Sequence, residues 1–197
     1  MAACTYLLYP ISLVTWYPPH SMLTDLAWWL QKLEDGSVMH TLHPCGPLQD
    51  LHLYIDASTS WGIGIIIGDH WASFKLSPTW KIMGRDICWL ETIAIELLTY
   101  FLEEMGLHDC HLLIHSDNQG TIGALDKGHS PNAHINLSVC CMYLLLSHLS
   151  ISPEIIYVDS LANPADPISC REQGEAGQHL SHNFKPPDKL INSFLHV

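Results

Sequence analysis

Basic residues are scarce in this chain of 197 residues. It carries 8 Lys and Arg against 20 Asp and Glu, so its formal net charge at pH 7 is −12. Proteins that bind nucleic acid through its phosphates do so mainly with clustered Lys and Arg. Composition therefore excludes a broadly basic binding surface, and taken alone it argues against a nucleic-acid partner.

Paired cysteines and long apolar runs are also missing. The seven cysteines are odd in number and form no CxxC pair, which favours buried, reduced thiols in an intracellular protein of the cytoplasm or nucleus. No run approaches the roughly 20 apolar residues that span a bilayer, so we expect no membrane partner. The apolar stretch 6–17 lacks a basic leading segment and contains Pro10, so we expect no cleaved signal peptide.

The chain does have enough apolar material for a real core. Hydrophobic residues make up 48% of it, which excludes global disorder. Its length fits one sizeable domain plus an appendage. We therefore divide the chain into an N-terminal extension (residues 1–47), a main domain (48–171) and a C-terminal segment (172–197).

The two terminal segments have their own patterns. Prolines interrupt the extension, which holds one predicted helix at 22–33. The C-terminal segment predicts a polar, Gly-containing linker followed by a short docking helix at 190–197. Either segment is a candidate for binding a protein partner.

Alternating apolar residues open the main domain. Leu51, Leu53 and Ile55 recur with the period of two that is typical of a strand. A run of Ile residues at 62–68 and a further run at 70–76 follow after short turns. Three strands with such short connections predict an antiparallel meander.

Longer apolar periods follow the meander. Residues 87–105 predict a long helix with one apolar face. Further elements are predicted as helices at 118–126, 133–149 and 163–170 and as strands at 111–115 and 154–159. Because both strands follow helices, they should run parallel to the first strand. The order predicts a mixed α/β (α+β) fold with a central, mixed five-stranded sheet and helices on both faces.

Four acidic residues stand at strand ends or helix starts, where burial makes a carboxylate costly: Asp56, Glu91, Asp117 and Asp166. Each alone has an ordinary explanation as a turn residue or helix cap. Together they can converge at one sheet edge, where buried like charges persist only with cations between them. Hard oxygen ligands suit Mg²⁺ or Mn²⁺. Two such ions can activate a water and stabilise the leaving oxygen of an in-line phosphoryl displacement.

The segments around these acids carry a family resemblance. They are Tyr-Ile-Asp-Ala-Ser (54–58), Glu-Thr-Ile-Ala (91–94), Ser-Asp-Asn (116–118) and Asn-Pro-Ala-Asp (163–166). They resemble the ribonuclease H domains of reverse transcriptases, most closely those of gypsy-like and DIRS-like retroelements and of hepadnaviruses. There Asn-Pro-Ala-Asp precedes a short Ser-containing segment, as Pro167-Ile168-Ser169 does here. The resemblance covers about residues 51–171.

Upstream, the resemblance continues more faintly. Asp25–Trp29 is similar to the helix that connects a polymerase domain to its ribonuclease H domain, so residues 1–47 resemble a polymerase connection segment. The chain has no polymerase palm motif and is therefore not a reverse transcriptase on its own. A domesticated retroelement fragment is one origin that fits this organisation.

The resemblance implies a ribonuclease H-like fold and a metal-dependent endonuclease. Such an enzyme hydrolyses the RNA strand of RNA–DNA hybrids with two Mg²⁺ or Mn²⁺ ions and leaves a 3′ hydroxyl. It implies that Asp56 and Asp117 bind both ions. Glu91 would hold the ion near the leaving group, and Asp166 the ion that carries the nucleophilic water.

Candidate substrate-binding residues surround the acids. Ser58 follows Asp56 within the first motif, and Gln119 follows Asp117 and would touch the substrate strand by the same resemblance. Four cations can form a modest phosphate-binding rim or can be ordinary solvated charges: Lys75, Lys81, Arg85 and Lys127.

Some features leave alternatives open. No His lies between Tyr157 and Asp166, where many cellular ribonucleases H carry one, which favours a retroelement origin. Glu96 is a possible substitute for Glu91, although it should point about 140° away around the helix. The net charge favours a rival function, a retroelement-derived binding or scaffolding module with little or no nuclease activity. A third alternative keeps the chemistry but acts on single-stranded nucleic acid or a DNA junction.

Overall fold

The computed structural model describes residues 20–34, 46–172, 178–180, 184 and 186–196. The chain divides into two compact units, residues 1–41 and residues 42–197. Helix α1 (His20–Glu34) is the described part of the first unit and contains the helix expected at 22–33. Throughout the described ranges, every helix is too short or too polar to cross a membrane.

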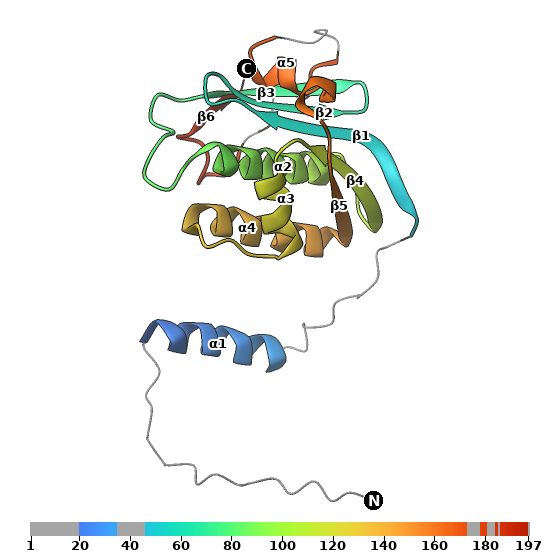
Figure 1. Ribbon diagram of the computed structural model, residues 1–197. Helices are drawn as coiled ribbons and strands as arrows, with labels where there is room; N and C mark the ends of the chain where they lie inside the picture. The colour runs from blue at the N-terminus through green and yellow to red at the C-terminus, as the bar shows by residue number, and fades with distance from the viewer. Residues whose placement is uncertain (1–19, 35–45, 173–177, 181–183, 185, 197) are drawn as a thin grey trace, which may run out of the picture. The chain divides into compact units, whose positions relative to one another are not determined.

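The second unit is built on a six-stranded sheet in the order β5-β4-β1-β2-β3-β6 (Figure 1). Its first five strands in the chain are β1 (Leu48–Ala57), β2 (Gly62–Ile67), β3 (His70–Leu76), β4 (Cys110–Ser116) and β5 (Ile151–Tyr157). β1, β2 and β3 form the predicted antiparallel meander. β4 runs parallel to β1, and β5 runs parallel to β4, as expected for strands that follow helices.

Helices lie on both faces of this sheet (Figure 1). On one face, α2 (Ile87–Glu104) packs against β1 and β2, and α4 (Ala133–Leu149) packs against α2. The short α3 (Gln119–Asp126) contacts α2 and β5. On the other face, a 3-10 turn (Ser160–Ala162) leads to α5 (Asp166–Ser169), which contacts β1, β2 and β3. The mixed α/β architecture confirms the predicted fold class and is consistent with a ribonuclease H-like fold.

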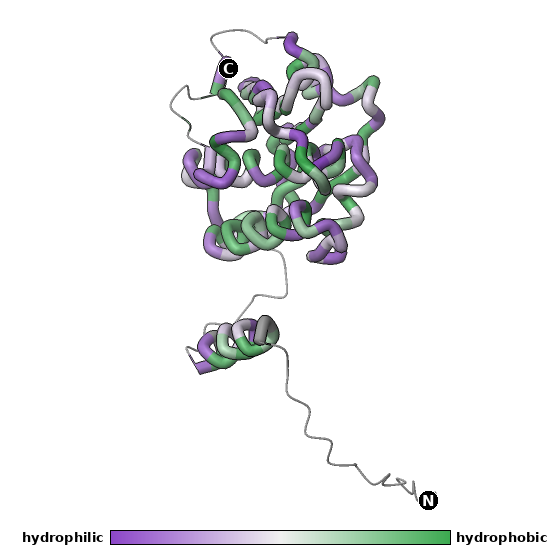
Figure 2. Tube along the Cα trace, turned by 90° about the vertical axis from the view of Figure 1, so that its left-hand side faces the viewer, coloured by the Kyte–Doolittle hydropathy of each residue, from purple (hydrophilic) through white to green (hydrophobic). Residues whose placement is uncertain are grey.

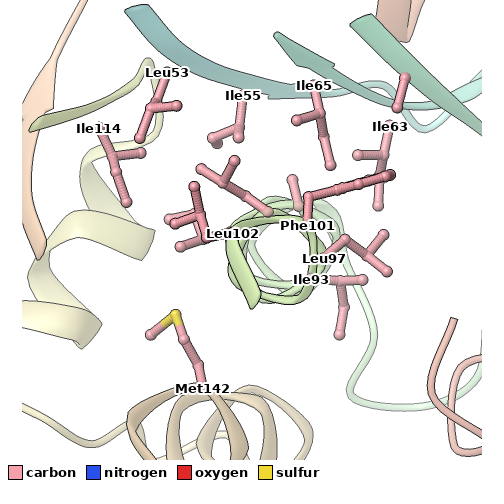
Figure 3. Packing of buried hydrophobic residues seen from close by; sticks show 14 of the residues in the cluster. Leu53, Ile55, Ile63, Ile65, Ile93, Leu97, Phe101, Leu102, Ile114 and Met142 are labelled. Carbon is pink, nitrogen blue, oxygen red and sulfur yellow. The ribbon is translucent and has the colours of Figure 1, made fainter. Parts of the chain in front are cut away.

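The core lies between the sheet and α2. Figure 3 shows the apolar side chains that meet there: Leu53 and Ile55 from β1, Ile63 and Ile65 from β2, and Ile93, Leu97 and Phe101 from α2. All are buried, and each contributes about 1.5–3 kcal/mol by leaving water. In Figure 2 the chain alternates between hydrophobic stretches and hydrophilic turns. Because β1 directs Leu53 and Ile55 toward α2, the alternate residues Tyr54 and Asp56 lie on the opposite face of the sheet, which α5 covers.

The helix expected at 190–197 is wrong, and so is the expected strand count. The chain turns at residues 188–193 and then forms β6 (Phe194–His196), which pairs antiparallel with β3. Leu190 and Phe194 are buried, and the Phe194 ring stacks on Trp89 with 6.0 Å between centroids. Contacts with distant residues therefore fix this segment, and eight residues are too few to establish a helical period.

A buried ion pair fastens the same segment to α2. Glu96 is fully buried, and Lys189 Nζ lies 2.5 Å from its Oε1 atom. Burial raises the pKa of the Glu96 carboxyl, and Lys189 partly offsets this. Glu96 thus helps to dock the C-terminal segment and does not substitute for Glu91.

Docking of β6 can be tested with two neighbouring residues. Phe194→Ala should lower the free energy of unfolding by about 3–5 kcal/mol, because it removes a buried ring and leaves a cavity beside Trp89. Leu195 is 56% exposed, so Leu195→Ala is the matched control and should cost under about 0.5 kcal/mol. Urea denaturation followed by tryptophan fluorescence measures both. Equal losses would contradict the described docking of β6.

Candidate metal centre

Two of the predicted acids emerge from adjacent strands. Asp56 lies near the end of β1 and is 4% exposed, with its side chain on the face that α5 covers. Asp117 follows directly after β4, which is the parallel neighbour of β1. Both carboxylates therefore lie at the same edge of the sheet, as the sequence predicted.

Glu91 reaches this edge from α2. Asp86 caps the helix by accepting a hydrogen bond from the Trp89 backbone N–H at 3.1 Å, which sets where α2 begins. Glu91 Oε1 accepts a hydrogen bond from the backbone N–H of Ala57 at 3.2 Å. Its other oxygen, Oε2, is buried and accepts no hydrogen bond from the described residues. One oxygen of Glu91 is thus anchored to β1, and the other is free to take a ligand.

The three carboxylates converge closely. One oxygen each from Asp56, Glu91 and Asp117 lies within 4.8 Å of the other two. Burial, followed by the charges of Asp56 and Asp117, raises the pKa of Glu91 to about 9. Burial also raises the pKa of Asp56 to about 7, and Asp117 and Asp166 add to the effect. Without a cation, protons must neutralise part of this group.

These residues fit a divalent metal ion. Carboxylate oxygens are hard donors, and two oxygens that bind one Mg²⁺ or Ca²⁺ ion lie at most about 4–5 Å apart. One oxygen from each acid of the triad lies within 4.8 Å of the other two, so the three can share one ion. A cation would also satisfy the buried Glu91 Oε2 atom and offset the repulsion that raises both pKa values. The triad can therefore hold a metal ion.

Asp166 lies at the rim of the same site. It begins α5, is exposed, and lines one pocket with the other three acids. Asn163 holds this segment on the sheet, since its Nδ2 donates to the Ile55 carbonyl at 2.9 Å and its Oδ1 accepts from the Ala165 N–H at 3.1 Å. The Asn-Pro-Ala-Asp motif is thereby fixed beside Asp56. The structure brings all four predicted acids to one pocket. Oxygens of three of them, Asp56, Glu91 and Asp117, lie close enough together to bind the same ion.

A glycine allows α5 to approach the sheet. Gly64 of β2 is the strand partner of Asp56. A Cβ atom at Gly64 would lie 2.6 Å from both the Ala165 carbonyl oxygen and the Ser169 backbone nitrogen. Any larger residue would push α5 away, and the hydrogen bond from the Ser169 hydroxyl to Asp56 Oδ2 would break.

Two serines contact the acids of the site but were not predicted from the sequence to be site residues. Ser169 donates to Asp56, which partly counteracts the rise in the pKa of Asp56. Ser160 Oγ donates to Asp117 Oδ2 at 2.5 Å. Ser169 lies in the segment that carries the family resemblance, so a signal for it existed. No local pattern joins Ser160 to Asp117, which lies 43 residues earlier.

Only some of the predicted substrate-binding residues lie at the acidic pocket. Ser58 lines the acidic pocket, whose full lining is Asp56, Ala57, Ser58, Thr59, Ile87, Glu91, Asp117, Asn118, Asp166 and Cys170. Gln119 and Lys127 are exposed at the two ends of α3, outside this lining. Gln119 follows the lining residue Asn118 directly.

The other three predicted cations lie against tryptophans. Lys75 Nζ is 5.1 Å from the ring centroid of Trp61, and Lys81 Nζ is 6.0 Å from that of Trp80. Arg85 Cζ is 4.3 Å from the ring centroid of Trp89. Arg85 Nη1 also donates to the Trp80 carbonyl at 3.3 Å and to Ser193 Oγ at 3.1 Å. Burial lowers the pKa of Arg85. Arg85 thus packs the C-terminal segment, and none of the three lines the acidic pocket.

Comparison with models of protein families, with curated proteins and with solved structures finds no match to this chain. A function must therefore be argued from the geometry of the acidic pocket and from the sequence motifs.

The raised pKa of Glu91 makes a prediction for the metal-free protein. Burial raises the pKa of Glu91 from its usual 4.5 to about 9, so between these pH values the folded state keeps a proton that the unfolded state has lost. Its contribution is complete below the lower value and is lost as pH rises through the higher one. In EDTA, the free energy of unfolding should therefore fall from about pH 5 to about pH 9.

Two matched substitutions isolate this contribution. Glu91→Gln removes the titrating group, so its stability should fall less over the same pH range. Glu103→Gln changes an exposed acid on the same helix and should keep the wild-type slope. Urea titrations at several pH values give the slopes. Identical slopes for all three proteins would show that Glu91 keeps an ordinary pKa.

Proposed function

We propose that this chain is a metal-dependent endonuclease of the ribonuclease H type, which hydrolyses the RNA strand of RNA–DNA hybrids. The observation that carries the proposal is the convergence of Asp56, Glu91 and Asp117 around a buried, unpartnered oxygen of Glu91. The sequence motifs supply the substrate class, since they resemble ribonuclease H domains of reverse transcriptases. Mg²⁺ or Mn²⁺, as two ions, is the cofactor that suits this set of oxygens.

The four acids would divide the work by position. Bound divalent ions supply an activated water and offset the charge that develops in an in-line displacement at phosphorus. Asp56 and Glu91 are buried and would hold ions from the floor of the pocket. Asp117 and Asp166 are more open and would face the side from which water and the phosphodiester enter.

The serines would keep the ligands in place. Ser169 and Ser160 each donate to one oxygen of Asp56 and Asp117, respectively, and leave the second oxygen of each carboxylate available. Hydrogen bonds to metal ligands fix their orientation, and losing such a partner typically lowers metal affinity or activity about 10- to 100-fold. The polar side chains of Ser58, Thr59 and Asn118 also line the pocket and can face a nucleic-acid backbone.

Net charge favours a second candidate function. A chain with a charge of −12 binds polyanions poorly unless cations are placed locally, which suits a binding or scaffolding module without nuclease activity. The clustered acids favour catalysis, because a scaffold gains nothing from burying carboxylates that repel one another. Metal binding and cleavage distinguish the two.

The decisive assay uses an RNA–DNA hybrid with a labelled RNA strand, in Mg²⁺ and in Mn²⁺. Asp117→Asn removes one negative charge from the metal site, and its rate of cleavage should drop at least about 100-fold, which corresponds to about 3 kcal/mol. Asp126→Asn changes an exposed acid at the end of α3 and should cleave like the wild type. Added Mn²⁺ should raise the melting temperature of the wild type by linkage, and that of Asp117→Asn less.

Other outcomes select the alternatives. A wild-type chain that neither cleaves the hybrid nor gains stability from Mn²⁺ would be a binding or scaffolding module. Cleavage of single-stranded nucleic acid or of a DNA junction, with the hybrid left intact, would keep the chemistry and change the substrate. An Asp117→Asn variant that unfolds while retaining activity would make Asp117 a structural residue.

A further inference from the structure

Two basic residues from distant parts of the chain meet at one indole ring. Trp61 lies in the turn between β1 and β2 and is half-buried. Lys75 Nζ lies 5.1 Å from the centroid of its ring, and Arg171 Cζ lies 5.4 Å from it. The indole face attracts both cations through its quadrupole and so restricts where they can move.

This cluster of Trp61, Lys75 and Arg171 borders the acidic pocket. Lys75 pairs with Gly62 and Asp56 pairs with Gly64, so Lys75 and Asp56 point to the same face of the sheet, the one that α5 covers. Trp61 follows the pocket-lining residue Thr59 by two positions, and Arg171 follows the pocket-lining residue Cys170 directly. A polymer that enters the pocket would pass these cations.

The two cations have no acidic partner within the described ranges. The ion pairs found there involve His108, His111 and Lys189, and none involves Lys75 or Arg171. No acid among the described residues therefore neutralises either cation, and both remain able to pair with an anion. Two other cations are committed elsewhere, since Lys189 pairs with Glu96 and Arg85 hydrogen-bonds to the Trp80 carbonyl and to Ser193.

The backbone at Arg171 is also unusual. Its φ is 89°, in the left-handed region that disfavours any residue with a side chain. Arg171 ends the turn after α5, a position where glycine would avoid this strain. Such outliers are tolerated where the side chain has a role. Here the strained position places the guanidinium over Trp61.

We propose that Lys75 and Arg171, positioned by Trp61, bind the phosphate backbone of the nucleic-acid strand beside the acidic pocket. This inference rests on the proposed function for the identity of the polyanion. Arg171 can bind a phosphate with two parallel N–H donors, and Lys75 can act as a point charge on the same or the next phosphate. Trp61 is a positioning residue, because it acts through the two cations.

The cluster of Trp61, Lys75 and Arg171 would allow a chain with a net charge of −12 to bind a polyanion locally. Each phosphate neutralised contributes about −0.9 to the slope of log affinity against log salt concentration. Two cations beside the pocket therefore predict a shallow slope, of about −2 from this site. A protein with a net charge of −12 can bind a polyanion at a local group of cations while the remaining surface repels the polyanion.

The test is fluorescence anisotropy with a labelled RNA–DNA hybrid across a salt series. Ca²⁺ replaces Mg²⁺ in the buffer, because it takes the same oxygen ligands with looser geometry. Lys75→Gln and Arg171→Gln should each weaken binding about tenfold, as expected for a lost bond to a charged group, and flatten the salt slope by about 0.9. Glu103→Gln changes the charge of an exposed residue on α2 by one unit and is the control, with wild-type affinity expected.

Two further variants test the role of the guanidinium group and the role of the indole ring. Arg171→Lys keeps the charge but loses the two parallel donors, so it should keep the wild-type salt slope and bind with an affinity between those of the wild type and Arg171→Gln. Trp61→Leu removes the indole and should weaken binding while leaving the salt slope near the wild-type value, because both charges remain. Urea unfolding midpoints at the wild-type value would show that the Lys75 and Arg171 variants fold normally.

The outcomes separate this inference from the proposed function. If Lys75→Gln and Arg171→Gln bind the hybrid like the wild type, the inference is wrong, whereas Asp117-dependent cleavage would keep the proposed function. If the wild type binds no hybrid and cleaves none, both fail. If the cluster variants lose affinity while no protein cleaves, the strand-binding site stands and the nuclease does not.

Discussion

The mutual repulsion of Asp56, Glu91 and Asp117 is the constraint on which the rest of this structure depends. Three carboxylates with oxygens within 4.8 Å of one another oppose folding unless protons or cations neutralise them. Several backbone and side-chain contacts hold these carboxylates in place. β1 and β4 pair in parallel, the Ala57 amide holds Glu91, and Asn163 binds the strand that carries Asp56. The surrounding core must therefore stabilise the arrangement, since the acids alone do not.

The packing of α5 shows how closely structure and site are joined. Gly64 has no side chain, so the backbone of α5 lies directly on β2, and Ser169 reaches Asp56 from there. The same helix places Asp166 at the pocket rim and delivers Arg171 to Trp61. One small residue in the sheet thus determines the position of an acid, a hydrogen-bond donor and a cation.

Local periodicity explains what the sequence could predict. β1 to β5 and α2 to α4 follow apolar repeats of two or 3.6 residues that turn residues interrupt, and the parallel direction of β4 follows from the helix before it. The meeting of Asp56 and Asp117 follows from adjacent strand ends. β6 was missed because Trp89 and the edge of β3 determine it, about a hundred residues away. The pairs Ser160–Asp117, Lys189–Glu96 and Arg171–Trp61 likewise depend on tertiary contacts.

Net charge is a poor measure of the charge at any one site, for a physical reason. It sums carboxylates that belong to different environments: exposed acids, Glu96 in an ion pair, and the triad whose members share protons or a cation. If the proposed function holds, divalent ions in the pocket would reverse the sign of the local charge, and the cations at Trp61 would add to that effect. A phosphate strand and the ions would then stabilise each other, because each would neutralise charge that repels ligands of its partner's sign or its own neighbours. Linkage would make this coupling reciprocal, so bound metal would raise the affinity for the strand by the same factor as a bound strand would raise the affinity for metal.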